Sequence, residues 1–514
     1  MVTVLATLTT VAIDVCHCQQ ENPGIKIEIT KRGLDYTNDV FNQLIHRQLM
    51  SNGDQVATVR EKWMGGTFTM SNAEVSSFHS PKSSYSIFPP DQVRWALNGG
   101  ELKFRANWNY HRKILFFPAI ISGNAVATLF NFKLLLTADF RRDPNGNAQF
   151  LNVNCQLDSA HFHVDLDGSL AGDMLNMFRG FIAKAIQPEM HRQICEATKT
   201  MASRYMNAKL AAFPRDVAVA RMFYLDNRIY DGYPIVNRNS VEVAQIGAIR
   251  SRMSPTANAT NPPAPTAPPL ASYPTSAEKM INIYMSDYLI NSFFYHAFIT
   301  NASVLRFTSN EHSQQFGFMR ANCSAAAGEV CLGILFPELW QRSPTLNPLV
   351  VLSTDAPIQV RLGNENAQSA KNNKNTNDQQ PPASVISVAV NVQLFAGDFG
   401  ESTERTSTPV LEIDAIMHAE TDLFLIGNAA RVAARVRLTS VATTIKANQL
   451  RSITNTGIGQ LLDYLLPVAE SEVNKKLASG LPIPWIRDVE FVFPRLSILE
   501  RTAVLSADVR YTKL

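Results

Sequence analysis

A proline-rich stretch divides this chain of 514 residues almost in half. Residues 254–276 read SPTANATNPPAPTAPPLASYPTS and contain seven prolines. Proline fixes φ and lacks a backbone N–H, so such a stretch cannot form a core helix or strand and instead behaves as an extended, semi-stiff spacer. The sequence therefore predicts an N-terminal unit over residues 22–250, a linker over 251–276 and a C-terminal unit over 277–514.

The two units begin alike. Residues 24–30 (GIKIEIT) alternate apolar and polar side chains, as a half-buried strand does, and Ile281–Ile283 takes the corresponding place after the linker. An Asp-Tyr pair, Asp35-Tyr36 or Asp287-Tyr288, follows in each unit and begins an amphipathic helical pattern. The repeated order of strand, Asp-Tyr pair and helix indicates an internal duplication.

A second, longer helical pattern follows in each unit. It covers about residues 170–210 in the first unit and about residues 458–478 in the second, and each contains a proline, Pro188 or Pro467. Elsewhere apolar residues recur at every second position, as in residues 385–396, which predicts antiparallel strands that are apolar on one side. We therefore expect an α+β chain in which antiparallel strands dominate.

The apolar run 114–138 allows two interpretations. It is long enough for a membrane helix, but Pro118 and Lys133 interrupt it. From Val126 onward, apolar residues recur with the period of two that is typical of a strand. We therefore interpret the run as two strands around a turn at Ser122-Gly123-Asn124, and expect no transmembrane segment.

The N-terminus predicts a secretory signal peptide over residues 1–18, and hence a secreted, extracellular protein. Residues 2–13 are uncharged and apolar or small, although the basic segment that usually precedes them is lacking. Cys16 and Cys18 occupy the −3 and −1 positions of a cleavage site before Gln19. A metal fragment at these two cysteines is the alternative, but no partner cluster accompanies them.

Cleavage at this site leaves an even number of cysteines, as suits an oxidising compartment. The four are Cys155, Cys195, Cys323 and Cys331. Three N-x-S/T sequons agree with secretion and are candidates for glycosylation: Asn258, Asn301 and Asn322.

The charge distribution argues against a nucleic-acid partner. The net charge is +3 and no dense basic stripe occurs. Residues 21–250 hold 26 Lys and Arg against 21 Asp and Glu, with basic pairs at Arg112-Lys113 and Arg141-Arg142. The first unit is therefore mildly basic, a bias that favours anionic lipid surfaces.

No catalytic or cofactor motif is present in the sequence. G-x-S-x-G, H-E-x-x-H and P-loop patterns are lacking, so we expect neither an enzyme nor a cofactor. His161, His163, Asp165 and Asp167 would share one face of a strand. A metal site is one interpretation, but the simpler one is the polar, water-facing side of a half-exposed strand, and we expect no metal.

Three segments together resemble a known family. They are Asn22–Tyr36, the stretch from Cys155 to Cys195 with AHFHVDL between them, and the run Leu465–Tyr511. Their order and spacing resemble the group of the bactericidal/permeability-increasing and lipopolysaccharide-binding proteins, whose relatives include the phospholipid and cholesteryl ester transfer proteins. The resemblance extends over essentially the whole chain after residue 21.

The resemblance implies two tandem elongated barrels, each a twisted antiparallel sheet wrapped around a long helix, joined by a central sheet into a boomerang shape. It implies a Cys155–Cys195 disulfide that ties a strand to the long helix. A bond between Cys323 and Cys331 is not part of that pattern, and we expect it as a local clamp.

The resemblance further implies apolar pockets that hold the acyl chains of a phospholipid or another amphipathic lipid, with lipopolysaccharide or a lipid particle surface as possible partners. Candidates for lipid contact are Ile25, Ile27, Phe41, Leu44 and Phe178. Each of them is equally compatible with ordinary core packing. The alternative function is a structural or receptor-docking protein whose interior is filled.

Overall fold

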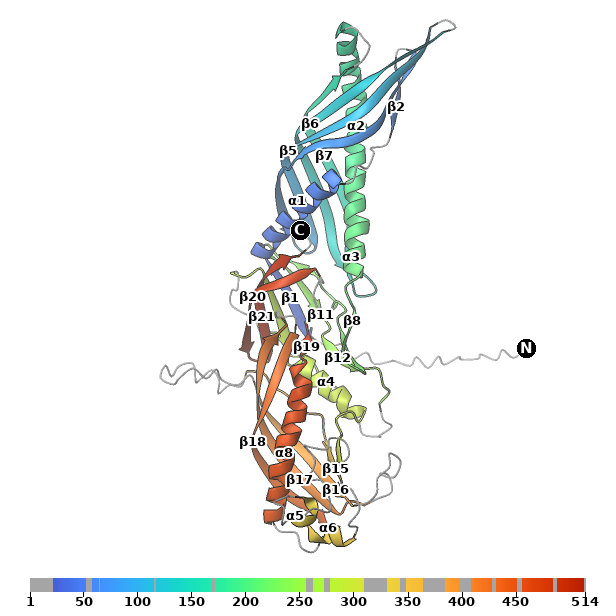
Figure 1. Cartoon of the computed structure of the whole chain (residues 1–514). Helices are drawn as coiled ribbons and strands as arrows, with labels where there is room; N and C mark the ends of the chain where they lie inside the picture. The colour runs from blue at the N-terminus through green and yellow to red at the C-terminus, as the bar shows by residue number, and fades with distance from the viewer. Residues whose placement is uncertain are drawn as a thin grey trace, which may run out of the picture.

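The protein is elongated, with its two halves placed end to end (Figure 1). The computed structural model describes residues 22–51, 58–63, 65–114, 117–167, 172–255, 262–271, 278–308, 331–342, 348–363, 384–396, 408–427, 431–450, 455–483 and 488–512. Antiparallel strands dominate, and helices lie against curled sheets. The prediction of a strand-rich α+β chain is confirmed.

One sheet forms most of the N-terminal half, in the order β2-β3-β5-β6-β7, with β4 pairing to β5. Its strands are β2 (Val59–Trp63), β3 (Gly66–His79), β4 (Lys82–Phe88), β5 (Gln92–Ile114), β6 (Phe117–Arg142) and β7 (Ala148–Leu166). Helix α1 (Lys31–Ser51) crosses this sheet, while α2 (Gly172–Thr200), the π-helix η1 (Met201–Met206) and α3 (Asn207–Ala211) follow one another along it (Figure 1).

A second sheet forms the C-terminal half, in the order β14-β15-β16-β17-β18-β19. Its strands are β14 (Leu305–Thr308), β15 (Leu349–Ser353), β16 (Ser384–Phe395), β17 (Leu411–Ile426), β18 (Arg431–Asn448) and β19 (Leu481–Pro482). The described residues of this half include the helices α4 (Tyr288–Ile299), α5 (Leu332–Leu335), α6 (Pro337–Arg342) and α8 (Asn455–Ala478).

A central sheet joins the two halves, in the order β10-β11-β1-β13-β21-β20. Its strands are β10 (Ile235–Val236), β11 (Ser240–Gln245), β1 (Ile25–Thr30), β13 (Ile281–Ser286), β21 (Thr502–Tyr511) and β20 (Val489–Leu499). Strands β1 and β13, the first strand of each half, are direct antiparallel neighbours, with Ile27 opposite Ile283. A small sheet of β12 (Ala248–Ser251), β9 (Phe223–Asp226) and β8 (Asp216–Ala220) lies beside it.

The predicted turn at Ser122-Gly123-Asn124 is wrong. Strand β6 continues through these residues, and the chain reverses between Ile114 and Phe117 instead. Gly123 lies directly opposite Trp108, whose side chain is fully buried and donates a hydrogen bond to the carbonyl of Asn124. Gly123 therefore lies within the ladder, opposite Trp108, and does not end the strand.

The Asp-Tyr pairs begin a helix in only one half. Asp287 is the N-cap of α4, as expected, but α1 begins at Lys31, so Asp35 and Tyr36 lie within the helix. The Tyr36 hydroxyl instead accepts a hydrogen bond from the backbone N–H of Tyr511, 2.9 Å away. Tyr36 therefore attaches the first helix to the last strand.

The described part of the proline-rich segment packs against the body of the protein. Residues 262–271 form neither helix nor strand, in agreement with their proline content. Ala267, however, is buried against Ala248 and Tyr288, and its carbonyl accepts a hydrogen bond from the Asn22 side chain. The segment thus forms no core helix or strand but is attached to the body of the protein at Ala267.

Candidate functional site

The inner face of the N-terminal sheet is a long apolar surface. Every second residue of β5 from Leu102 to Tyr110 is buried, and the residues between them carry the polar side chains of the outer face. The buried apolar cluster on this face includes Phe68, Met70, Leu102, Phe104, Trp108, Tyr110, Ala127, Leu129, Leu134 and Leu166. Its side chains follow the length of the sheet, so the sheet presents one continuous apolar wall.

Helices α2 and η1 cover this wall. Met190 and Ala202 belong to the same buried cluster, and Ala183, Ile194 and Met206 pack against it. A disulfide between Cys155 of β7 and Cys195 of α2 joins helix and sheet, with the two Cα atoms 5.4 Å apart. The helix therefore closes the apolar face that the strands alone would leave open.

A small polar cluster anchors α1 on the same sheet. Asn38 and Asn42 both donate hydrogen bonds to the Ser83 hydroxyl of β4, and Trp95 Nε1 donates to Asn38 Oδ1 at 2.7 Å. The ring of Phe41 stacks on Trp95 with centroids 3.9 Å apart. These contacts fix the position of α1 across β4 and β5.

A tyrosine of β4, Tyr85, contacts the start of α1 and has a raised pKa. Tyr85 of β4 donates a hydrogen bond to the carbonyl of Lys31 at 3.2 Å. Burial, together with the charge of Asp35, raises the pKa of Tyr85 to about 12. The phenol therefore keeps its proton, and its hydrogen bond to the Lys31 carbonyl, further into the alkaline range than an ordinary tyrosine would.

The candidates for lipid contact lie in different places. Ile25 and Ile27 of β1 are buried in the central core, against residues of both halves such as Leu225 and Ile283. Phe41 lies on Trp95, at the N-terminal sheet. Leu44 and Phe178 belong to α1 and α2, but their side chains lie outside the described residues. The structure thus does not bring Ile25 and Ile27 together with Phe41.

The sequence contains a pattern that identifies residues of the apolar wall, although none of them is among the candidates for lipid contact. Residues 102–110 alternate as strictly as residues 24–30, with Leu102, Phe104, Trp108 and Tyr110 on one side. These side chains form the centre of the apolar wall. Trp95 was not identifiable in this way, because only the fold places it against Phe41.

The C-terminal half repeats the arrangement of an apolar sheet face covered by a helix. The cluster there combines α8 with the inner face of β15 to β17 and with α5 and α6. It includes Leu332, Phe336, Val350, Leu394, Ile413, Ile458, Leu461 and Leu465. Each half therefore has its own apolar core, with the central core between them.

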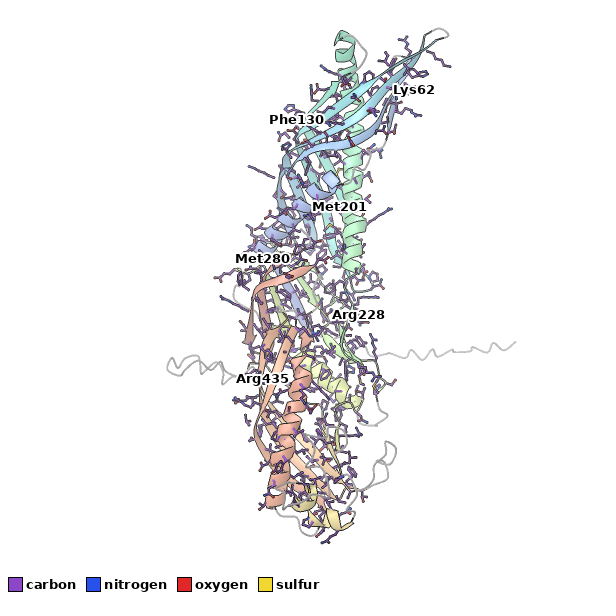
Figure 2. The ribbon with its side chains drawn as sticks, in the orientation of Figure 1. Lys62, Phe130, Met201, Arg228, Met280 and Arg435 are labelled. Atoms are coloured by element: carbon purple, nitrogen blue, oxygen red, sulfur yellow. A yellow bond between two sulfur atoms is a disulfide. The ribbon has the colours of Figure 1, made fainter. Side chains whose placement is uncertain are left out.

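Basic residues gather where the β2–β3 and β5–β6 hairpins end, far from the C-terminal half; Figure 2 labels Lys62 there. Strand pairing places Lys62, Thr67, His111 and Ile120 in one row across four strands. The row lies on the outer face, and Ile120 is 67% exposed. We call the exposed Arg60, Lys62, Arg112, Lys113 and Ile120 the hairpin end; its four cations form no ion pair with any described residue.

The structure describes only some of the cysteines and sequons that the sequence analysis names. Cys331 is disulfide-bonded and buried, whereas Cys323 lies outside the described residues, so their pairing stays a prediction. Asn301 is exposed, at the end of α4, with a φ of 55°. Asn258, Asn322 and residues 1–18 also lie outside the described residues. No helix in the described parts is both long and apolar enough to cross a membrane.

Acid is expected to destabilise the protein through His296 of α4. Burial lowers the pKa of this imidazole, and the nearby charge of Arg250 lowers it further. In the unfolded chain the imidazole gains a proton near pH 6.5. As the pH falls through that value, the unfolded state binds more protons than the folded state and stability decreases. Tm should therefore fall between pH 7.5 and 5.5, and less so in His296→Gln; equal pH profiles would contradict this assignment.

Comparison with known proteins agrees with the architecture. Residues 10–205 match the N-terminal domain of the LBP / BPI / CETP family, and residues 223–511 match its C-terminal domain. A bactericidal permeability-increasing protein of Sebastes schlegelii is 21% identical over 505 residues, which cover 96% of each chain. A lipopolysaccharide-binding protein of Bos taurus is also 21% identical, over 96% of this chain and 95% of its own.

A solved structure shows the same fold. The crystal structure of lipopolysaccharide binding protein aligns with a TM-score of 0.54 and 16% identity, covering 96% of this chain and all of the other. The two domain matches together account for most of the sequence. The resemblance expected from Asn22–Tyr36, Cys155–Cys195 and Leu465–Tyr511 is thereby confirmed, and this chain belongs to the LBP / BPI / CETP family.

Proposed function

We propose that this chain is a secreted lipid-binding protein, not an enzyme, that holds the acyl chains of an amphipathic lipid within its two halves. The observation that carries the proposal is the apolar wall of β5, continuous from Leu102 to Tyr110 and covered by α2. Each CH₂ group left in water costs about 0.8 kcal/mol, so a carrier of lipid needs a long apolar enclosure. The wall and the helix over it supply the apolar side chains that such an enclosure requires, which supports the proposal.

The proposal includes the arrangement that the family implies. Residues 22–250 and 277–514 would each form an elongated barrel around a long helix, with residues 251–276 as the linker and residues 1–18 as a signal peptide. Phospholipid is the ligand class we favour, because relatives of this chain are named for lipopolysaccharide binding, another lipid with several acyl chains. Asn301, exposed at the end of a helix, remains a proposed site of glycosylation.

The hairpin end is proposed to contact anionic lipid surfaces. Its four cations, which form no ion pair with a described residue, attract phosphate groups, and the exposed Ile120 can enter the acyl boundary beside them. Each well-placed cation contributes about 1 kcal/mol to such binding.

Replacing three of these cations with alanine, as Lys62→Ala, Arg112→Ala and Lys113→Ala together, should weaken binding to anionic vesicles by about 100-fold. Vesicle sedimentation at low and high salt measures the loss. The matched control removes Arg221, Arg435 and Lys476, three exposed cations outside the hairpin end, and should leave binding nearly unchanged. Equal losses in both triple variants would place the contact elsewhere.

Mass spectrometry of an organic extract of the purified secreted protein tests lipid binding itself. We expect phospholipid in stoichiometric amounts, near two molecules per chain, one for each half. Protein that is free of lipid and also takes up no fluorescent phospholipid would refute lipid binding. That result would favour a structural or receptor-docking protein whose interior is filled by its own side chains.

A further inference from the structure

In each half, a helix lies against the free edge of a sheet where a further strand would otherwise pair. Strand β7 ends the N-terminal sheet, and α2 to α3 run beside it (Figure 1). Strand β18 pairs with β19 only at Arg431 and Val432, and α8 runs beside the rest of its free edge. We call these two helix–strand boundaries the seams.

At the N-terminal seam, an asparagine binds both polar groups of one backbone residue. Asn207, the first residue of α3, accepts a hydrogen bond from the Phe150 N–H at 2.7 Å. Its side-chain amide donates to the Phe150 carbonyl at 2.9 Å. A strand partner would satisfy the same two groups, so Asn207 replaces one rung of a β-ladder.

At the C-terminal seam, another asparagine forms the same pair of hydrogen bonds. Asn474 of α8 accepts a hydrogen bond from the Val436 N–H and donates one to the Val436 carbonyl, both at 2.8 Å. One helical turn earlier, Glu470 accepts a hydrogen bond from the Leu438 N–H at 3.0 Å. The spacing of four residues on the helix matches two residues along the strand, about 6 Å in each case.

The two asparagines begin short sequences that agree in four of five positions. Residues 207–211 read NAKLA and residues 474–478 read NKKLA. In the first half, the π-helix Met201–Met206 directly precedes Asn207. A π-turn contains one more residue than an α-turn and so rotates the side chains that follow it. The duplicated sequence and the duplicated contact point to one role in both halves.

Along the seams, the described hydrogen bonds between helix and strand are fewer than those of the strand ladders in the same sheets. Separating β5 from β6 would break a ladder that runs from Gln92 to Ile114. Opening a seam at Asn207 or Asn474 breaks two hydrogen bonds, each of modest net strength. We propose that Asn207 and Asn474 are latch residues, and that acyl chains enter and leave each half through its seam; this inference rests on the proposed lipid binding.

The two seams differ in one respect. The Cys155–Cys195 disulfide crosses the N-terminal seam covalently, whereas residues 455–478 of α8 contain no cysteine. The C-terminal seam is therefore the one free to open widely. Lipid in the C-terminal half should exchange faster than lipid in the N-terminal half.

The test uses Asn474→Leu and Asn207→Leu in the full-length protein, loaded with fluorescent phosphatidylcholine and mixed with unlabelled acceptor vesicles. Asn474→Leu should release lipid about tenfold faster, and Asn207→Leu only about twofold to threefold faster while its disulfide is intact. Thr198→Val is the matched control, because the Thr198 hydroxyl donates a hydrogen bond within its own helix, to the Ile194 carbonyl. If Asn474→Leu does not fold, Asn474→Ser replaces it in the lipid-release test.

Hydrogen exchange at the Phe150 and Val436 amides reports whether each seam has opened, independently of lipid. Deprotected amides with unchanged release rates in a protein that does bind lipid would overturn the latch role. Amides that stay protected in both leucine variants would overturn it as well. If the unmodified protein takes up no lipid, the proposed function is refuted. The exchange rates of the Phe150 and Val436 amides then show on their own whether the asparagines hold the seams closed.

Discussion

Replacing Arg501 with methionine is expected to lower the free energy of unfolding by about 3–5 kcal/mol, one of the two largest effects we foresee. The Asp287 carboxylate is 0% exposed and is bound on both oxygens by Arg501, at 2.9 and 3.2 Å. Methionine keeps most of the side-chain length but leaves a buried charge without its partner. Asp287 is the N-cap residue of α4 and its backbone carbonyl accepts hydrogen bonds from the N–H groups of Ile290 and Asn291, so a shift of Asp287 should also disturb the first turn of that helix.

Two further variants separate the buried charge from other effects. Arg501 is 39% exposed and can turn to solvent, so Asp287→Asn alone should destabilise less than Arg501→Met. Adding Asp287→Asn to Arg501→Met should then restore part of the stability. The matched control is Arg361→Met, whose ion pair with Glu500 is more than half exposed and should contribute about 0–1 kcal/mol. Urea midpoints measure all four, and equal losses at Arg361 and Arg501 would refute the argument.

Removing the disulfide with Cys155→Ala and Cys195→Ala is expected to destabilise the N-terminal half by about 4 kcal/mol. The bond closes a loop with a sequence separation of 40 residues, and in the chain-entropy model opening it frees that loop in the unfolded state. Cys155 packs against the apolar cluster and Cys195 is buried, so the alanines also remove buried volume.

Hydrogen exchange of peptides from β7 localises this loss to the N-terminal half. The matched comparison is Cys331→Ala, which opens a disulfide of the C-terminal half and should leave the protection of β7 unchanged. An unaltered urea midpoint in the double variant would mean that helix–strand packing alone holds α2 in place.

Local sequence patterns predicted the helices and strands better than they predicted which of these elements pack against one another. The alternation of residues 24–30 and the helical stripe near Leu461 and Leu465 reflect one buried face, and burial follows directly from periodicity. The turn at Ser122-Gly123-Asn124 failed because glycine marks either a turn or a close approach, and only the position of Trp108 decides between them. That position is set by strand register, which no short window of sequence contains.

For the candidate site, too, the local sequence did not predict which residues lie together. Ile25 and Ile27 were identified correctly as one apolar face, yet that face meets Leu225 and Ile283 in the central core and lies apart from Trp108. Contacts such as Asn207 with Phe150 join residues 57 positions apart through a side chain and a backbone group. Nothing in either local segment specifies them.

The pairing of β1 with β13 has a consequence for how the chain is made. Residues 25–29 reach their neighbours at 281–285 only after the ribosome has translated the linker, and the strand after those, 502–511, emerges last. In a nascent chain that contains only the first half, the edge of β1 that pairs with β13 has no partner strand. For the same reason, a protease that cuts within residues 254–276 should leave two fragments that stay together, since each supplies strands that the other needs.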